Sequence, residues 1–276
     1  MIKKIFHLSD LHIRTFKFHD EYRAQFQKFL DSVKDYILEN GLSPDEVRIA
    51  ILGDIFHQKI TISNEQLMLG SWLLAECAEI CKTIVIAGNH DLLENNTDRM
   101  DSISPIVQLL DNDNIAYYKD KTCYLDNNIV WCNFSIFYGN ERPDIESAKI
   151  KFGVNKKYIG LYHAPIIGSQ TDLGYTLDHG ANVDHFKGCD AVLLGDIHKE
   201  QIITLTDDNK KIKLKYPSSL VQQGFGENVS GHGYSIWDVD SLNDTHIELP
   251  NDAAFFQFKV TNLSQLEDKS YKLINK

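Results

Sequence analysis

The first third of the chain alternates short apolar runs with amphipathic segments. From Tyr22 to Ile37 apolar side chains recur at helical spacing, which predicts a helix over about Asp20–Glu39. Apolar runs around this helix predict buried strands at Lys4–Leu8, Val47–Leu52 and Thr83–Ala87, with a second helix over Glu65–Ile80. This alternation is typical of a buried parallel sheet, so the sequence predicts an α/β core.

The later part of the chain reads as shorter strands separated by turn signals. The predicted strands are Ile115–Tyr118, Thr122–Leu125, Ile129–Phe134, Tyr158–His163, Ala191–Leu194, Ile202–Leu205, Ile212–Tyr216, Tyr234–Val239 and Phe255–Val260. Asp207-Asp208-Asn209 lies between two of them and indicates a hairpin. From Gln201 onward the pattern predicts a meander.

Length and composition allow one large domain or two small ones. The chain has 276 residues, of which 43% are hydrophobic. No run approaches the ~18 apolar residues that a membrane span needs. Asp10 and His12 interrupt the only N-terminal apolar run, and no signal peptide follows. We therefore expect a cytoplasmic protein.

Charge and cysteine content narrow the function further. A net charge of −11 argues against a uniformly basic nucleic-acid binder. Lysines cluster within 149–157 and 210–215, which we interpret as solvated loop and hairpin charges rather than as a DNA track. Cys77 and Cys81 lie one helical turn apart among apolar residues, so we expect buried helix positions rather than a zinc pair.

Five places in the chain share one pattern, in which an apolar strand ends and ligand-type residues follow at once. They are Asp10-Leu11-His12, Gly53-Asp54, Gly88-Asn89-His90-Asp91, His163, and Gly195-Asp196-Ile197-His198. Functional groups of α/β proteins gather outside the carboxyl ends of strands, so distant segments can meet at one rim. No G-x-S-x-G, P-loop or Rossmann motif competes with this set.

The residue types indicate a metal centre. Mixed carboxylate, imidazole and amide ligands suit Mn²⁺, Fe²⁺ or Zn²⁺ better than metals that prefer thiolates. The candidates suffice for two ions, which at a separation of about 3.5–4 Å can clamp a phosphate and activate water. A carboxylate between the ions is a natural bridge, and a histidine outside the ligand set can protonate the leaving oxygen.

These five motifs, in this order, resemble those of the calcineurin-like metallophosphoesterase superfamily. The downstream segments Tyr216-Pro217-Ser218-Ser219-Leu220 and Phe225-Gly226-Glu227 are most similar to the SbcD-like DNA repair nucleases, including their phage relatives. The resemblance implies a four-layer α-β-β-α sandwich of two mixed sheets flanked by helices. It implies a nuclease domain over residues 1–250. Residues 251–276 would be a C-terminal strand and polar tail, at the start of a truncated or reduced capping domain.

The resemblance also implies roles for individual residues. Asp10, His12 and His198 would bind the first metal, Asp54 would bridge both, and Asn89, His163 and Asp196 would bind the second. His90 would be the catalytic histidine that orients the phosphate or protonates the leaving group, with Asp91 holding its imidazole by a hydrogen bond. The cofactors would be two divalent ions, with Mn²⁺ expected and Mg²⁺, Fe²⁺ or Zn²⁺ as alternatives.

Three positions depart from the family pattern. Asp196 stands where the common motif has histidine, so we expect a working site with altered charge and metal preference. Ser218 replaces a usual glycine. His57 follows Gly53-Asp54-Ile55-Phe56 where these nucleases often have aspartate, and we interpret it as a surface histidine rather than a substrate contact. His7 is expected in or under the core.

By resemblance, the function would be Mn²⁺-dependent exonuclease and endonuclease activity in DNA repair, recombination or replication. The implied partners are DNA, a second copy in a homodimer, and an SbcC-type coiled-coil ATPase, in a bacterial or phage-infected host cytoplasm. Two alternatives stay open. One is a phosphoesterase for small molecules or phosphoproteins, which fits the acidic balance. The other is a DNA-binding subunit whose site is impaired at Asp196.

Overall fold

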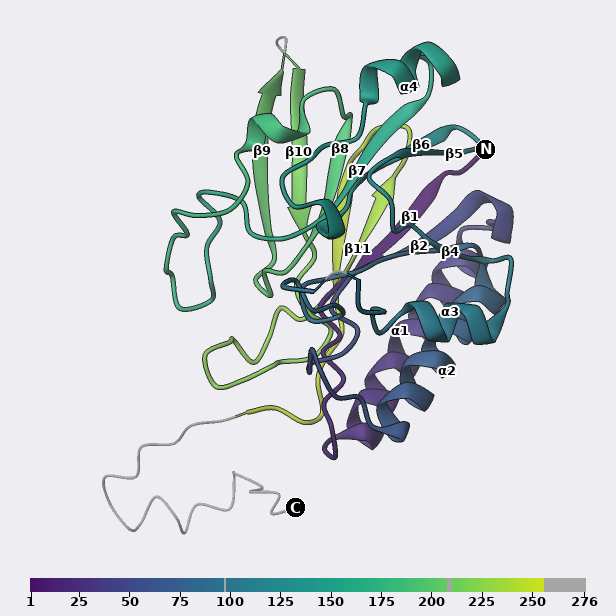
Figure 1. Cartoon of the computed structure of the whole chain (residues 1–276). Coiled ribbons are helices and arrows are strands. Elements are labelled where there is room, and N and C mark those ends of the chain that lie inside the picture. The colour runs from purple at the N-terminus through teal and green to yellow at the C-terminus, as the bar shows by residue number, and fades with distance from the viewer. Residues whose placement is uncertain (97, 208–209, 256–276) are drawn as a thin grey trace.

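Two six-stranded sheets pack face to face, with helices on both outer sides. The computed structural model describes residues 1–96, 98–207 and 210–255. Figure 1 shows both sheets, with α1, α2 and α3 grouped on one side and α4 apart from them. The predicted four-layer α/β sandwich of two mixed sheets is confirmed.

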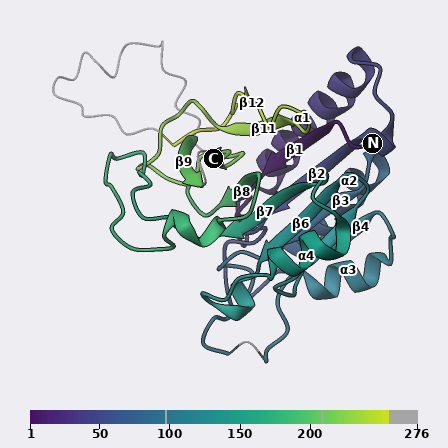
Figure 2. The same cartoon turned by 90° about the horizontal axis from the view of Figure 1, so that it is seen from above.

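The first sheet has the strand order β12-β11-β1-β2-β3-β4, seen from above in Figure 2. Its strands are β1 (Lys4–Leu8), β2 (Val47–Leu52), β3 (Thr83–Ile86), β4 (Ile115–Tyr117), β11 (Gly233–Asp238) and β12 (Asp244–Glu248). Strands β1 to β4 run parallel, whereas β11 pairs antiparallel with β1, and β12 pairs antiparallel with β11. The parallel core is therefore the part that the strand–helix alternation predicted.

The second sheet has the order β5-β6-β7-β8-β10-β9. Its strands are β5 (Cys123–Asp126), β6 (Ile129–Phe134), β7 (Lys157–His163), β8 (Ala191–Gly195), β9 (Gln201–Asp207) and β10 (Lys210–Tyr216). Strands β6, β7, β8 and β10 are parallel neighbours, and the two edge strands pair antiparallel. The expected pairing of β9 with β10 is present, with residues 208–209 of its turn outside the described part.

Helices cover the outer faces. They are α1 (His19–Glu39), α2 (Asn64–Ile80), α3 (Ser104–Leu110) and α4 (Ile145–Phe152), with short 3-10 helices at Pro44–Glu46, Ile136–Tyr138 and Val183–Phe186. The apolar faces of α1 and α2 share one core with the first sheet, and α4 packs on the second. Ser63 caps α2 through a reciprocal pair with Gln66. No helix in these ranges is long and apolar enough to span a membrane.

Alternation along the strands places one face against helices and the other against the opposite sheet. In β1, Phe6 and Leu8 pack in the helix-facing core, whereas Ile5 packs between the sheets. The layer between the sheets is built from residues of both, including Ala50, Leu52, Ile84, Trp131, Ile159, Leu161, Leu193 and Trp237. Both sheets are therefore buried on two faces.

Polar contacts also connect the two sheets. Arg48 of β2 donates to both carboxylate oxygens of Asp126 in β5, at 2.8 and 2.9 Å. Lys215 of β10 is 1% exposed and lies 3.1 Å from Asp244 of β12. The interpretation of the 210–215 lysines as solvated charges is therefore wrong for Lys215, because its alternating strand position turns it toward the other sheet.

The sequence patterns missed some elements. The meander predicted after Gln201 is wrong, because β10 belongs to the second sheet while β11 pairs with β1 in the first. Helices α3 and α4 have only 7 and 8 residues, too few to give a clear period. The predicted strand Phe255–Val260 falls, apart from its first residue, outside the described residues.

His7 lies in β1 with no exposed surface. Its Nε2 is 3.0 Å from the Leu194 carbonyl of β8, so Nε2–H donates there, while Nδ1 accepts from the Trp237 indole at 3.4 Å. Both ring nitrogens are thereby satisfied in the neutral form. Burial lowers the pKa of His7 from 6.5 to about 3.

This burial predicts a pH-dependent stability. Between pH 6.5 and about 3 the unfolded chain binds a proton at His7 that the native state does not, so stability falls as pH falls through this window. From pH 6.5 to 5 the loss from this residue amounts to about 2 kcal/mol. Chemical denaturation at both pH values should show a smaller pH-dependent loss in His7→Gln than in the wild type. Equal losses would contradict the assignment.

Candidate metal centre

The loops after five parallel strands converge where the two sheets meet. Strands β1, β2 and β3 of the first sheet and β7 and β8 of the second end here, and β2 and β3 contact β7 directly across the sandwich. The loop after β1 runs along the loop after β2. The Asp10 N–H donates to the Gly53 carbonyl at 3.2 Å, and the His12 N–H donates to the Asp54 carbonyl at 2.9 Å. The rim expected from the sequence is therefore formed by both sheets.

Glycines end these strands because the backbones approach too closely for a side chain. A Cβ on Gly88 would lie 2.2 Å from Asp54 Oδ1 and 2.5 Å from the Asp54 backbone nitrogen. A Cβ on Gly195 would lie 2.2 Å from the Leu52 carbonyl oxygen and 2.6 Å from His163 Nδ1. Glycine at these strand ends lets the two sheets close around Asp54 and His163.

One group of side chains combines Asp10, His12 and His198. Their ligand atoms lie within 4.8 Å of one another. The Nε2 atoms of His12 and His198 are 3.1 Å apart, and His198 Nε2 is 3.8 Å from Asp10 Oδ1. These are three of the residues expected at a first metal.

A second group combines Asp10, Asp54 and His163, all buried. His163 Nε2 is 3.3 Å from Asp54 Oδ1, while Asp54 Oδ2 faces His12 Nε2 at 3.4 Å. The two oxygens of Asp54 thus point into the two groups. This is the arrangement that the predicted bridging role requires.

The donor set fits divalent metal ions on independent grounds. Asn89 Oδ1 and His163 Nε2 are buried and have no hydrogen-bond partner among the described residues, which is costly unless something else binds them. Metal–ligand bonds of about 2.1 Å place neighbouring ligand atoms about 3.0–3.4 Å apart. The distances from His12 Nε2 and His163 Nε2 to their neighbours fall in that range.

Outer hydrogen bonds fix the tautomers of two candidate ligands. His163 Nδ1 is 2.6 Å from the Leu52 carbonyl oxygen, and His198 Nδ1 is 2.6 Å from Glu227 Oε1. Each Nδ1–H therefore donates outward, which leaves Nε2 to face the centre, as in most metal-binding histidines. Glu227 belongs to the segment that carried the nuclease resemblance, but the sequence did not assign it this contact.

The pKa values of the buried groups are shifted because several charged groups lie close together. Burial and the neighbouring Asp54 raise the pKa of Asp10, although His163 and His198 oppose this. For Asp54, burial is outweighed by His163, His12 and His90, so its pKa is lowered. The carboxylates raise the pKa of His163, and Glu227 and Asp10 raise that of His198 to about 9, against burial. Metal binding at these groups would therefore be coupled to proton release.

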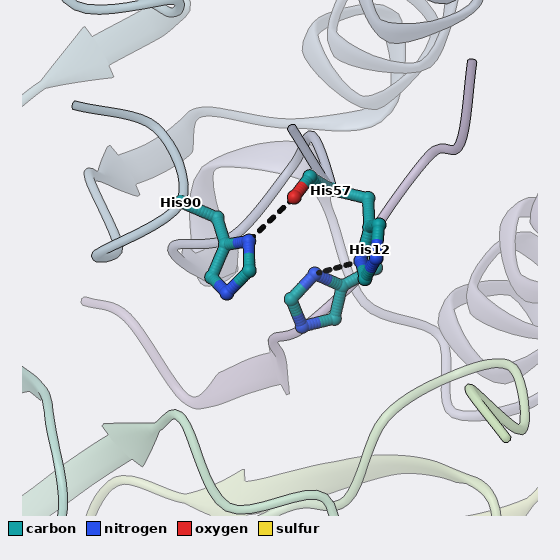
Figure 3. A group of neighbouring side chains, drawn as sticks. All are labelled: His12, His57 and His90. Carbon is teal, nitrogen blue, oxygen red and sulfur yellow. Dashed lines mark hydrogen bonds between the residues drawn. The ribbon is translucent and has the colours of Figure 1, made fainter. Parts of the chain in front are cut away.

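His12, His57 and His90 form a third group, shown in Figure 3. His57 is half-buried, and its Nδ1 lies 3.4 Å from His12 Nδ1. Its ring stacks on His90 with centroids 5.5 Å apart. The interpretation of His57 as a surface histidine is therefore wrong, because Phe56 pairs with Ile13 and places His57 against His12 and His90.

Asp91 does not hold the His90 ring as expected. His90 Nδ1 donates instead to the His57 carbonyl oxygen at 2.5 Å, as Figure 3 shows. The Asp91 carboxylate accepts backbone N–H groups of Gly88 at 3.0 Å, Ile55 at 3.1 Å and Phe56 at 3.3 Å. Asp91 therefore joins the loops after β2 and β3. It positions His90 only through the loop after β3, which carries both residues.

Asp196 contributes its backbone to the centre. Its N–H donates to both oxygens of Asp10 at 3.1 Å, and burial together with Asp10 and Asp54 raises the pKa of its carboxyl group to about 6. Its carboxylate is outside the three groups found among the described residues. Its role at a second metal, like that of Asn89, stays a prediction.

The chain is similar in sequence to known proteins, and this similarity agrees with a metal centre. A family model described as calcineurin-like phosphoesterase matches residues 3–200. The chain is also 34% identical over 279 residues to "Uncharacterized protein R555" of Acanthamoeba polyphaga mimivirus. That alignment covers 97% of this chain but 20% of the relative, so the chain spans about a fifth of that protein's length.

The close approach at Gly88 gives a testable prediction. In Gly88→Ala the new methyl group should displace Asp54 and lower Mn²⁺ affinity about 10-fold or more, measured by titration calorimetry or electron paramagnetic resonance. Gly224→Ala is the matched control, because no described atom beyond Gly224 and its two chain neighbours lies within 4 Å of the added Cβ. Equal Mn²⁺ binding by the two variants would show that Asp54 is not part of the metal site.

Proposed function

The chain belongs to the calcineurin-like phosphoesterase family, and from this we propose that it is an SbcD-like DNA nuclease that hydrolyses phosphodiester bonds. Family membership makes it a metal-dependent hydrolase; the DNA substrate is our proposal. The reaction type is supported by two neighbouring groups of metal-ligand side chains that share Asp10. One carboxylate oxygen of Asp54 faces His12 in the first group, and the other faces His163 in the second.

Two divalent ions, when bound, would polarise the phosphate and lower the pKa of water. Asp10, His12, His198 and Asp54 would hold one ion, and Asp54, Asn89 and His163 the other, with Asp196 proposed beside them. Since these side chains arise from both sheets, the sandwich fixes their separation before substrate arrives.

His90 supplies the proton chemistry. Its Nδ1–H is anchored on the His57 carbonyl, so Nε2 is the nitrogen that can take up and release a proton. A protonated Nε2 can donate to the leaving oxygen of the phosphodiester as the P–O bond breaks. Stacking on His57 restricts rotation of the ring and keeps Nε2 in one direction.

The DNA substrate is supported by the downstream segments that resemble those of SbcD-like nucleases. Both lie at the centre: Ser219 pairs with Ser9 in an isolated bridge and donates its N–H to the His198 carbonyl at 3.4 Å. Glu227 binds His198 Nδ1 directly. Segments that resemble the nuclease type are thus in contact with the candidate metal ligands.

Mn²⁺ as the metal, homodimerisation and partnership with an SbcC-type coiled-coil ATPase are proposed on the same resemblance. So is action in the cytoplasm of a bacterial or phage-infected cell. A phosphoesterase for small molecules or phosphoproteins is the second candidate, favoured by the net charge of −11.

His90→Asn tests the assignment of the acid. We expect kcat for Mn²⁺-dependent cleavage of linear DNA to fall about 10²- to 10⁴-fold, because proton donation to the leaving group is lost. Bound Mn²⁺ per chain should stay unchanged, since His90 is outside the predicted ligand set. Undiminished cleavage would remove His90 from the mechanism.

A substrate panel separates the two candidate functions. Linear DNA, cyclic nucleotides and phosphopeptides should be compared at equal Mn²⁺ loading. A preference for DNA in kcat/KM supports the nuclease, whereas a preference for either of the others identifies the second candidate.

A further inference from the structure

Arg14 lies two residues beyond His12, in the loop that carries Asp10 and His12. Its guanidinium is half-buried and held from two sides. Nη2 donates to the Gln223 carbonyl at 2.7 Å, and Nη1 lies 3.1 Å from His57 Nε2. Because arginine only donates, His57 Nε2 must accept. His57 Nδ1 in turn lies 3.4 Å from His12, so Arg14 is one imidazole ring away from a candidate metal ligand.

The three acceptor atoms of this guanidinium, His57 Nε2 and two oxygens of Gln223, are neutral. Within the described residues Arg14 forms no ion pair with a carboxylate; its hydrogen bonds go to an imidazole and to amide oxygens. Arg14 is half-buried, so part of its charge is removed from water. Its contacts are His57 and Gln223, and the centre beside His57 would also hold divalent cations. A fixed cation at such a place is stabilised when an anion binds.

A cleft lies beside Gln223, the residue that anchors Arg14. The three contacts of Nη1 and Nη2 use only part of the five N–H donors of a guanidinium. Gln223, which holds Arg14, also lines a cleft of about 390 Å³ together with Asp196 and His198. The anchor of Arg14 and the candidate metal ligands therefore border the same open space.

We propose that Arg14 binds a phosphate oxygen of the substrate beside the metal centre. Planar guanidinium groups match phosphate oxygens with two parallel hydrogen bonds, which makes arginine well suited to the task. The proposal rests on the proposed phosphoesterase function, since it names the group that positions the substrate's phosphate at the same site.

The rival explanation is a structural tie that holds the His57 loop against the Gln223 loop. The two explanations differ in their effect on metal binding. Removing a phosphate-binding cation leaves Mn²⁺ affinity unchanged or raises it, because a like charge is removed. Removing a structural tie loosens His57 and His12 and weakens Mn²⁺ binding.

The experiment uses the full chain loaded with Mn²⁺ and inorganic phosphate as the probe. Phosphate affinity is measured by titration calorimetry for the wild type, Arg14→Met, Arg14→Lys and the control Arg23→Met. Arg23 stacks on Trp72 on the helix side, 4.0 Å from the ring centroid. We expect about a 10- to 100-fold loss for Arg14→Met, a smaller loss for Arg14→Lys, and no change for Arg23→Met.

Mn²⁺ affinity of the same variants, measured by electron paramagnetic resonance, should stay within about two-fold or increase. Phosphate binding that is absent in the wild type or unchanged in Arg14→Met overturns the proposal, as does a parallel loss of Mn²⁺ and phosphate affinity. If Arg14→Met does not fold, Arg14→Lys and the restoration of phosphate binding to Arg14→Ala by guanidinium ions decide.

Catalysis is scored separately, on linear DNA and bis-p-nitrophenyl phosphate. If the wild type cleaves neither, the proposed function fails, while the phosphate titration still tests Arg14. If the wild type cleaves them and phosphate binding does not depend on Arg14, only the present proposal fails.

Discussion

The structure depends on burying the carboxylates of Asp10 and Asp54 where two sheets meet. Neither has appreciable exposure, and two like charges this close cannot both remain ionised in a dry interior without cations around them. Imidazoles and backbone N–H groups provide part of that compensation, and the metal ions of the proposed function would provide the rest. The glycines at the strand ends follow from the same need, because only bare backbone lets the compensating groups come close.

The two sheets are held together at several depths by polar contacts within an apolar layer. Arg48 and Asp126 join them at one end, and His7 joins β1 to β8 near the centre. His163 donates from β7 to the end of β2 and so belongs both to the sandwich and to the site. Since the ligands come from both sheets, any slip of one sheet would separate them. The buried polar contacts therefore stabilise function as well as fold.

Backbone strain is concentrated at the same place. Asp10, His12, Asp54 and Asp196 all have positive φ angles, of 56°, 47°, 54° and 100°. Residues other than glycine rarely adopt positive φ angles, and each such residue lowers the folding stability by about 1–3 kcal/mol. The surrounding strands hold these conformations, which direct several polar side chains from tight loops toward one point. The sheets thus provide a rigid support, and the strained loops position the side chains of the centre.

The sequence by itself determined the strands, the long helices and the five ordered motifs, because apolar periodicity and residue chemistry are local properties. Only the tertiary structure decided that Asp91 joins loops instead of holding His90, that His57 lies against His12 and His90, and that Glu227 orients His198. It also assigned β10 and β11 to different sheets. These outcomes depend on which distant loops face one another. Spacing along the chain does not give the distances between residues of two different sheets.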